Sequence, residues 1–220
     1  MMKKPKVLIT AGPTLERIDD VRYISNFSSG KMGFALAEVF NQNGYDVTLV
    51  SGPVHLDCSD SIKRINVESA QNMYEAVSES YQTQDIIIMS AAVADFTPKA
   101  PYQGKIKKTS MDSLNIELKP TIDILAYVGQ HKSDKQILVG FALESENEIE
   151  YGKEKLARKN CDMIVVNSAN KTNSGFGGDD NTITIITKSK QLFTFPTMSK
   201  LKCAEIILEK TEEILIQING

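Results

Sequence analysis

Short apolar runs alternate along this chain with longer segments in which apolar positions recur every three or four residues. Continuous apolar runs are typical of strands buried on both faces, whereas the longer period is typical of amphipathic helices. The runs predict strands over residues 7–10, 46–51, 62–67, 85–90, 137–141, 162–166, 182–187 and 191–195. The periodic segments predict helices over residues 32–43, 70–81, 121–130, 148–159 and 200–218.

This alternation predicts an α/β fold: a Rossmann-like, doubly wound, mostly parallel sheet with helices on both faces. The last two strands predict an antiparallel C-terminal hairpin. We expect a single domain over residues 1–220, because this length and a hydrophobic fraction of 41% suit one core. Segments 97–113 and 167–180 fit neither pattern, and loops of such length are commonly lids, binding loops or interface arms.

The segment between the first strand and the first helix carries the residues that a phosphate site needs. Gly12 ends the strand, and Ser28, Ser29, Gly30 and Lys31 stand at the start of the helix. A helix N-terminus offers unpaired N–H groups and a positive dipole, and glycine lets an anion approach the backbone. The glycine spacing fits neither a Walker loop nor a G-x-G-x-x-G fingerprint, so the pattern predicts phosphate binding without naming a nucleotide.

Further candidate residues follow the ends of later strands, where doubly wound sheets bind ligands. One strand is followed by Ser90, Ala91, Ala92 and Asp95, and another by Phe141. Small residues would let the backbone reach a nucleotide, an aromatic ring could cover its base, and an acid could hold hydroxyls or a metal. Each has a structural alternative: the small residues could only permit helix packing, Asp95 could cap a helix, and Phe141 could belong to the core.

Lysines and one asparagine complete the candidate site. The sequence Lys-Ile-Lys-Lys occupies residues 105–108, Lys155 and Lys159 are four residues apart on one helix face, and Lys31 lies at the phosphate-binding helix. Such lysines are usually solvated, but together they could surround a triphosphate and neutralise the charge that develops during transfer. Asn26 could form a turn with its own side chain, or direct its amide at a carbonyl or acyl phosphate as an oxyanion donor.

Composition and charge argue against several other classes of protein. A net charge of −3 gives no support for nucleic-acid binding, and no apolar run is long enough to span a membrane. Cys58, Cys161 and Cys203 are odd in number and widely spaced, so we expect neither a disulfide framework nor a zinc site. The start of the chain lacks the apolar segment of a signal peptide, and we expect a cytoplasmic protein.

Five motifs, in order, resemble those of the bacterial phosphopantothenate–cysteine ligase family, whose members are also called phosphopantothenoylcysteine synthetases. They are RYISNFSSGKMGFALA (residues 22–37), SAAVADF (90–96), KIKK (105–108), GFALE (140–144) and Lys155-x-x-x-Lys159-Asn160. The first motif is long and specific, and the others gain weight from their order. The resemblance extends from residue 7 to about residue 173.

The resemblance implies an enzyme that joins 4′-phosphopantothenate to L-cysteine in coenzyme A biosynthesis. It implies CTP as co-substrate: the pantothenate carboxylate attacks the α-phosphate to give an acyl-cytidylate and pyrophosphate, and the cysteine amine then displaces CMP. Mg²⁺ would bridge triphosphate oxygens with few protein ligands, and the sequence assigns no metal ligand. An ATP-using version of the same ligase remains an alternative, because eukaryotic relatives prefer ATP.

Carried over by motif, the resemblance assigns Asn26 to conversion of the acyl-cytidylate and Lys105 to a loop that closes over it. Asn26, Ala91 and Ala92 would contact the substrate. Together with the glycine loop, the nucleotide site would comprise Gly12, Ser28, Ser29, Gly30, Lys31, Met89, Ser90, Ala91, Asp95, Lys105, Thr121, Ile122, Asp123, Ile124, Phe141, Lys155 and Lys159.

The chain begins at the synthetase's first strand, which favours a free-standing synthetase with decarboxylation left to a separate protein. The family also implies a homodimer, with segment 97–113 or 167–180 reaching the partner. A nucleotide-binding Rossmann-type oxidoreductase is one alternative, because Tyr151 and Lys155 have the spacing of a short-chain reductase pair. Gly12, however, is not followed by the glycines that class requires. A nucleotide sensor is the other alternative, although Asn26 and Lys105 together are more than binding requires.

Overall fold

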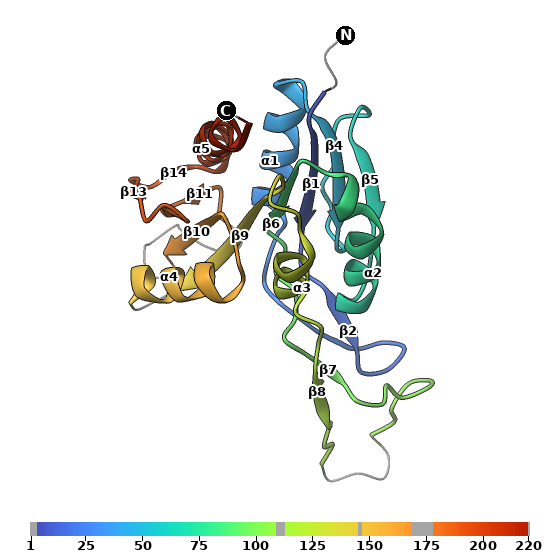
Figure 1. Cartoon of the computed structure of the whole chain (residues 1–220). Coiled ribbons are helices and arrows are strands. Elements are labelled where there is room, and N and C mark those ends of the chain that lie inside the picture. The colour runs from blue at the N-terminus through green and yellow to red at the C-terminus, as the bar shows by residue number, and fades with distance from the viewer. Residues whose placement is uncertain (1–3, 109–112, 145–146, 169–177, 220) are drawn as a thin grey trace.

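One sheet organises the part of the chain that the structure describes, and its strand order defines the fold. The computed structural model describes residues 4–108, 113–144, 147–168 and 178–219 (Figure 1). In spatial order the strands are β13 (Leu192–Thr194), β12 (Ile183–Thr187), β10 (Met163–Ser168), β9 (Ile137–Glu144), β6 (Ile86–Met89), β1 (Lys6–Ala11), β4 (Asp46–Ser51) and β5 (Lys63–Asn66).

The order in which the chain adds strands to this sheet reverses beside β1, at the centre of the sheet. The strands from β10 to β5 pair in parallel, and β12 and β13 add an antiparallel edge. From β1 the chain proceeds to β4 and β5, and it then returns to place β6 on the other side of β1. This reversal is a topological switch point, beyond which such sheets bind ligands at the carboxyl ends of their strands.

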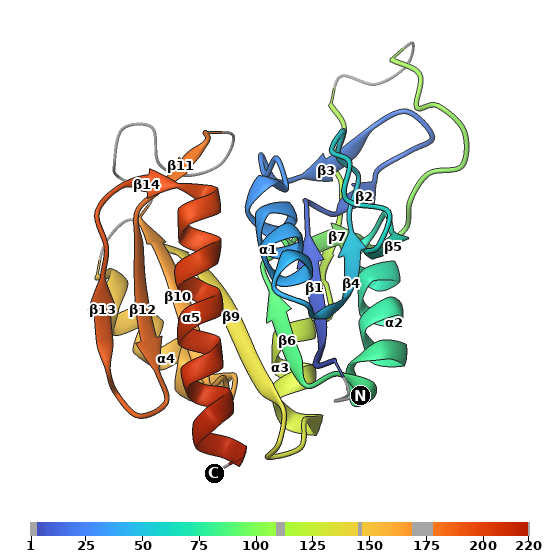
Figure 2. The same ribbon diagram turned by 90° about the horizontal axis from the view of Figure 1, so that it is seen from above.

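Helices cover both faces of the sheet (Figure 2). On one face lie α1 (Lys31–Gln42) and α5 (Lys200–Asn219), which pack against each other. On the other face lie α2 (Ala70–Ser80), α3 (Ile124–His131) and α4 (Glu148–Arg158), and a short 3-10 turn, η1 (Tyr81–Thr83), follows α2. The sheet is therefore the middle of three layers.

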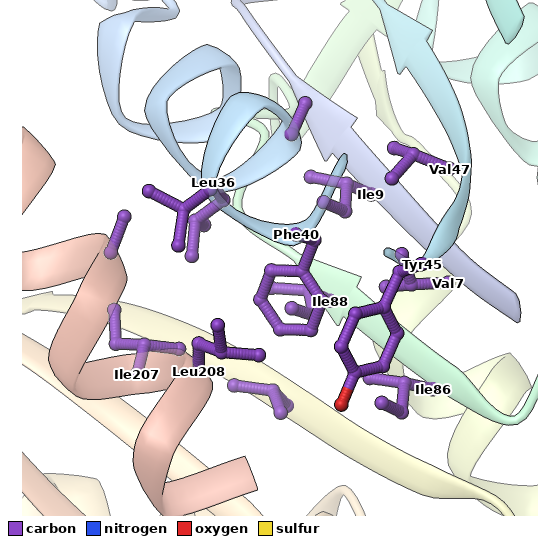
Figure 3. Close-up of a cluster of buried hydrophobic side chains, with 14 of the residues drawn as sticks. Val7, Ile9, Leu36, Phe40, Tyr45, Val47, Ile86, Ile88, Ile207 and Leu208 are labelled. Carbon is purple, nitrogen blue, oxygen red and sulfur yellow. The ribbon is translucent and has the colours of Figure 1, made fainter. Parts of the chain in front are cut away.

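Alternate side chains of each central strand supply the two cores. Val7 and Ile9 of β1 lie on the face of the sheet that α1 and α5 cover, and they share one buried cluster with Phe40 of α1 and Leu208 of α5 (Figure 3). Leu8, between them, joins the core under α2, α3 and α4. Burial of each such side chain contributes about 1.5–3 kcal/mol. Because both faces are covered, the strands are apolar without interruption, which is why the sequence reveals them.

Three short antiparallel pairs stand outside the main sheet, and the apolar pattern predicts none of them. They are β2 (Leu15–Arg17) with β3 (Tyr23–Ser25), β7 (Phe96–Pro98) with β8 (Leu118–Pro120), and β11 (Asp180–Asn181) with β14 (Met198–Ser199). The β7–β8 pair projects from the body of the molecule at the bottom of Figure 1. The sequence predicts loops over segments 97–113 and 167–180. Within these segments, residues 109–112 and 169–177 lie outside the described residues.

The predicted α/β fold is confirmed, including the mostly parallel sheet and the antiparallel hairpin. The prediction that a helix begins at residue 121 is wrong, because α3 begins at Ile124 with Asp123 as its N-cap. Thr121 donates its backbone N–H to the Asp95 carbonyl oxygen at 2.9 Å and its Oγ1 hydroxyl to that of Ala94 at 2.6 Å. These bonds tie Thr121 to the segment before β7. No helix in the described part of the chain is long and apolar enough to cross a membrane.

Candidate functional site

A cavity of about 540 Å³ opens where the carboxyl ends of the central strands meet the start of α1. Thr10 of β1, Met89 of β6, Phe141 of β9 and Asn167 of β10 all reach its wall. The cavity thus lies at the switch point of the sheet, and small-molecule sites commonly have volumes of about 300–1,000 Å³.

The start of α1 forms one wall of this cavity. Gly30 precedes the helix with φ of 79°, a left-handed conformation that glycine adopts without strain, and its N–H donates to Ser28 Oγ at 3.3 Å. Gly33 lets the first turn of α1 pack closely against β1 and Ser90, since a Cβ there would lie 2.5 Å from the Ala11 Cβ and 2.8 Å from Ser90 Oγ. The close approach holds the helix N-terminus, with N–H groups that lack intrahelical partners, at the cavity.

The segment after β6 lines the cavity with small residues. Ser90 Oγ donates to the Thr10 carbonyl oxygen at 2.6 Å, and the Ala91 N–H donates to Thr10 Oγ1 at 3.2 Å. Both residues are partly exposed at the cavity, where a ligand can reach them. Asp95 also lines the cavity, and β7 rather than a helix follows it, so the capping alternative for Asp95 is wrong.

Asn26 joins the glycine loop to the segment after β6. Its Nδ2 donates to the carbonyl oxygens of Ala92 at 3.0 Å and Val93 at 3.3 Å. These bonds reach a distant segment of the chain instead of closing a local turn. Because both Nδ2 hydrogens are used, Oδ1 is the side-chain atom through which Asn26 can contact a ligand. A role as an oxyanion donor would require one of the two bonds to break.

Two lysines of α4 form the opposite wall. Lys155 Nζ donates to the Phe141 carbonyl oxygen at 2.8 Å, and Lys159 Nζ is paired with the carboxylate of Asp123. Burial opposes ionisation of Asp123, but the bonds from Lys159 and from the Ala126 N–H hold its pKa below the ordinary value. Both lysines are half-buried and line the cavity, so they are not a solvated stripe. This wall can hold anionic groups.

The structure brings most of the sequence-predicted residues together. The predicted residues that line the cavity are Asn26, Ser28, Ser29, Gly30, Lys31, Met89, Ser90, Ala91, Ala92, Asp95, Thr121, Ile122, Asp123, Ile124, Phe141, Lys155 and Lys159. Gly12 and Lys105 do not line it. Gly12 lies directly behind Gly30, where a Cβ on Gly30 would be 3.3 Å from the Gly12 Cα. The ligand contacts of all these residues remain predictions.

Lys105 lies on an exposed segment whose neighbour is fixed. The Ile106 N–H donates to Asp19 Oδ2 at 3.1 Å, and Arg22 donates from its guanidinium to the Ile106 carbonyl oxygen at 2.8 Å. The buried Asp19 carboxylate also accepts the backbone N–H groups of Val21 and Arg22. Burial opposes ionisation of Asp19, but these N–H donors together hold its pKa below the ordinary value.

Acidification is therefore expected to destabilise the protein partly through Asp19. Since its pKa is lowered on folding, the carboxylate stabilises the fold above the unfolded-state pKa of about 4, and this contribution is lost as the pH falls through the lower folded-state value. The melting temperature of Asp19→Asn should then depend less steeply on pH below about 5 than that of the wild type. The matched control is Asp20→Asn, at the exposed neighbouring carboxylate. Equal slopes for the wild type and Asp19→Asn would contradict this account.

The sequence did not assign several residues of the cavity wall to the site. They are Thr10, Met32, Gly33, Val93, Leu125, Ala142, Leu143, Arg158, Asn167, Asn181 and Lys200. Most of them lie within two residues of a predicted residue, but Asn181 and Lys200 come from β11 and the start of α5. The sequence offers one indication of Lys200: a lysine at the start of a predicted helix is repelled by the helix dipole, so a role other than helix stabilisation could be expected for it.

The spacing of Tyr151 and Lys155 does not form a reductase site. Lys155 lines the cavity, whereas Tyr151 does not and is 46% exposed. A short-chain reductase needs both side chains at one substrate. This geometry counts against the oxidoreductase alternative.

A doubly wound sheet with a cavity at its switch point defines a Rossmann-like α/β protein. The chain belongs to the family described as DNA/pantothenate metabolism flavoprotein C-terminal domain, whose sequence model matches residues 2–215. The resemblance to the phosphopantothenate–cysteine ligases is thereby confirmed at the level of the family.

Comparisons with known proteins place this chain beside longer bifunctional relatives. The crystal structure of the C-terminal domain of coenzyme A biosynthesis bifunctional protein CoaBC is 42% identical, with a TM-score of 0.83, and the match covers 97% of this chain and 96% of that one. CoaBC of Bacillus subtilis (strain 168) is 48% identical over 205 residues, which are 93% of this chain and 50% of the relative. A cysteine/cysteine sulfinic acid decarboxylase of an unknown prokaryotic organism is 49% identical over 206 residues, 93% of this chain and 57% of the relative. The chain spans about half the length of these two relatives.

Proposed function

We propose that the protein is a ligase that joins 4′-phosphopantothenate to L-cysteine in coenzyme A biosynthesis, using CTP. The observation that carries the proposal is the convergence of Asn26, Lys31, Lys155 and Lys159 on one cavity. These residues come from the loop before α1, the start of α1 and α4, and three of them are cationic. Such a cavity suits a reaction between two phosphorylated molecules. The names of the CoaBC relatives support the same pathway.

The proposed reaction has two steps. A carboxylate oxygen of 4′-phosphopantothenate bonds to the α-phosphorus of CTP, and pyrophosphate leaves with the electron pair. The cysteine amine then bonds to the acyl carbon of the acyl-cytidylate, loses a proton, and releases CMP. The CMP carries away the former carboxylate oxygen, which explains the need for a nucleotide, because oxide is a far poorer leaving group.

The residues of the cavity would act by binding and charge stabilisation. The N–H groups at the start of α1 and the ammonium groups of Lys31, Lys155 and Lys159 would hold phosphate oxygens. The ring of Phe141 and the small residues Ser90 and Ala91 would bound the space for a base and an acyl chain. In this arrangement the protein supplies no covalent nucleophile, and preorganised charge lowers the barriers.

Magnesium would enter with the nucleotide. Among the described residues no group of three or more His, Cys, Asp or Glu could hold a metal ion. Asp123 and Asp179 are paired with Lys159 and Lys31. Phosphate oxygens match the ligands that Mg²⁺ prefers, so the lysines would hold the phosphates, and the phosphates would hold the ion. Bound Mg²⁺ would neutralise charge on the departing pyrophosphate.

A test of the proposal measures products with each nucleotide. With 4′-phosphopantothenate, cysteine and CTP, we expect pyrophosphate, CMP and the amide in equal amounts. ATP is the alternative, and CTP is favoured because the segments Lys-Ile-Lys-Lys and Ala-Asp-Phe resemble bacterial members. Amide formed with ATP and not with CTP would reverse the nucleotide assignment. No cysteine-dependent amide with either nucleotide would overturn the ligase proposal.

Lys105→Gln is expected to lower turnover about 10- to 100-fold by removing one charge-assisted contact, while the melting temperature changes little. The side chain is exposed, and the bonds that fix this segment belong to Ile106 and not to Lys105. The matched control is Lys107→Gln in the same segment. A large fall in the melting temperature of Lys105→Gln would show that Lys105 acts on the fold.

We also propose that the protein forms a homodimer through the β2–β3 and β7–β8 excursions. Large exposed side chains gather there, among them Phe27, which is 92% exposed, together with Val21, Tyr23, Phe96, Tyr102 and Leu118. Monomeric proteins rarely leave many large apolar side chains exposed in one region, and such regions commonly mark an interface. Light scattering should give twice the mass of one chain, and Phe27→Asp should shift it toward the monomer. A monomer mass at catalytic concentrations would contradict the proposal.

A further inference from the structure

A corner of the cavity beside α1 contains two polar residues, Asn181 and Lys200, that have no part in the proposed mechanism. Lys31 and Met32 of α1, Asn181 of β11 and Lys200 of α5 all line it. Elements α1 and α5 cover one face of the sheet, whereas Lys155 and Lys159 come from the helix layer on the other face. The cavity therefore has lysines on two opposite sides: Lys31 and Lys200 on one, and Lys155 and Lys159 on the other.

The amide of Asn181 is buried without an adequate partner. Its side chain is only 4% exposed, and Oδ1 makes no hydrogen bond with any part of the chain that the structure describes. Its Nδ2 lies 3.6 Å from Met32 Sδ, which is a weak acceptor. A buried polar group left in this way costs free energy, and a half-turn of the amide exchanges its donor and acceptor. After that turn Nδ2 would take the place of Oδ1 and could donate to a ligand that accepts hydrogen bonds.

Lys200 is held in the same corner under unfavourable conditions. It is buried and is the first residue of α5, where the helix dipole repels a cation. Its ammonium donates to the Gly178 carbonyl oxygen. Burial and the neighbouring charge of Lys31 lower the pKa of Lys200, although Asp179 and Asp180 oppose the shift. An anion in the cavity would add a favourable charge interaction to those that Asp179 and Asp180 supply.

We propose that Lys200 and Asn181, with Lys31 and the start of α1, form a second phosphate subsite, separate from the Lys155–Lys159 wall. The inference rests on the proposed function, which brings two phosphorylated molecules into one cavity. The group bound is a phosphate with free oxygens, which accept hydrogen bonds from the ammonium groups and the amide. Two sources carry such a group: the β- and γ-phosphates of the nucleotide, and the phosphate monoester of 4′-phosphopantothenate.

The test compares Lys200→Met with the matched control Lys202→Met. Methionine keeps much of the volume of lysine without its charge, and Lys202 lies in the same turn of α5 but is exposed and paired with Glu205. Three constants are measured: the KM for CTP, the KM for 4′-phosphopantothenate and the inhibition constant of inorganic pyrophosphate. Loss of a charge-assisted contact should weaken the affected constants about 10- to 100-fold in Lys200→Met and leave Lys202→Met near the wild type. Lys200→Arg should recover part of the loss.

The pattern of change identifies the phosphate. A rise in the CTP and pyrophosphate constants places the terminal phosphates of the nucleotide in the corner, and a rise in the 4′-phosphopantothenate KM alone places the monoester there. Asn181→Ala should weaken the same constants as Lys200→Met. If folded Lys200→Met leaves all three constants within about twofold of the wild type, no phosphate contact of useful strength exists and the subsite is refuted.

A binding measurement separates this inference from the proposed function. Calorimetric titration with inorganic pyrophosphate, and separately with inorganic phosphate, needs no turnover. Weaker binding to Lys200→Met than to wild type and Lys202→Met would support an anion subsite even if the wild type made no amide. Equal binding to all three proteins, with normal amide formation by the wild type, would refute the subsite and leave the ligase proposal intact.

Discussion

Asn26→Asp is expected to lower amide formation about 100- to 1,000-fold while pyrophosphate release continues. In the second step the Asn26 amide would exchange one of its bonds to Ala92 and Val93 for the developing oxyanion, and removing one such donor typically costs this much. The first step moves negative charge from the substrate carboxylate onto the leaving pyrophosphate. The second step creates a new negative charge on the acyl oxygen when the amine adds. A carboxylate at residue 26 would repel that charge, so the acyl-cytidylate should accumulate. Quenched reactions analysed by mass spectrometry would detect it.

The control for this substitution is Asn26→Ala. It removes the bonds to Ala92 and Val93 without adding charge, so it separates loss of positioning from electrostatic repulsion. Asn26→Ala should lose less amide formation than Asn26→Asp. Equal loss of pyrophosphate release and amide formation in Asn26→Asp would count against a role for Asn26 confined to the second step.

Gly33→Ala is expected to destabilise the protein by about 1–3 kcal/mol, as overpacking commonly does, and to raise the KM for the nucleotide about tenfold or more. Helix propensity alone predicts the opposite sign, since alanine is favoured over glycine by about 1 kcal/mol. The steric term should dominate because the added Cβ would lie 2.5 Å from the Ala11 Cβ and 3.0 Å from its Cα. Strand β1 cannot move without disturbing the sheet, so the start of α1 must shift away from the cavity. Thermal unfolding and nucleotide kinetics measure the two effects.

The double variant Ala11→Gly with Gly33→Ala is the matched control. It removes the nearest colliding atom and should recover part of both losses relative to Gly33→Ala. Ala11→Gly alone gives the cost of the glycine in β1. A Gly33→Ala protein with unchanged stability and unchanged nucleotide KM would show that the close contact of α1 with β1 does not position the site.

Burial explains which parts of the fold the sequence could predict. Strands such as β6 are apolar on both faces because helices cover both, and this leaves a continuous run in the sequence. The pairs β2–β3 and β7–β8 are different, since residues such as Tyr23 and Leu118 are exposed and these strands leave no continuous apolar run. The predicted start of α3 is three residues too early. Thr121 is instead hydrogen-bonded to the carbonyl oxygens of Asp95 and Ala94, and no local pattern in the sequence reveals these bonds.

The same reasoning separates the predicted from the missed residues of the site. The rule that ligands bind beyond strand ends finds Phe141, and the four-residue spacing to Lys159 on one helix face points to Lys155. Asn181 and Lys200 are brought to the cavity by the two-residue ladder of β11 with β14, which is too short to leave an apolar pattern. Long-range pairing of this kind is not encoded in any single window of sequence.

The central claim is that the carboxylate is activated as an acyl-nucleotide, and oxygen transfer tests it most directly. The reaction is run with 4′-phosphopantothenate labelled with ¹⁸O in its carboxylate, with cysteine and CTP, and the products are weighed by mass spectrometry. The account predicts one ¹⁸O atom in CMP, none in pyrophosphate, and one retained in the amide carbonyl. Label in inorganic phosphate, with release of CDP, would show an acyl phosphate instead and contradict the account.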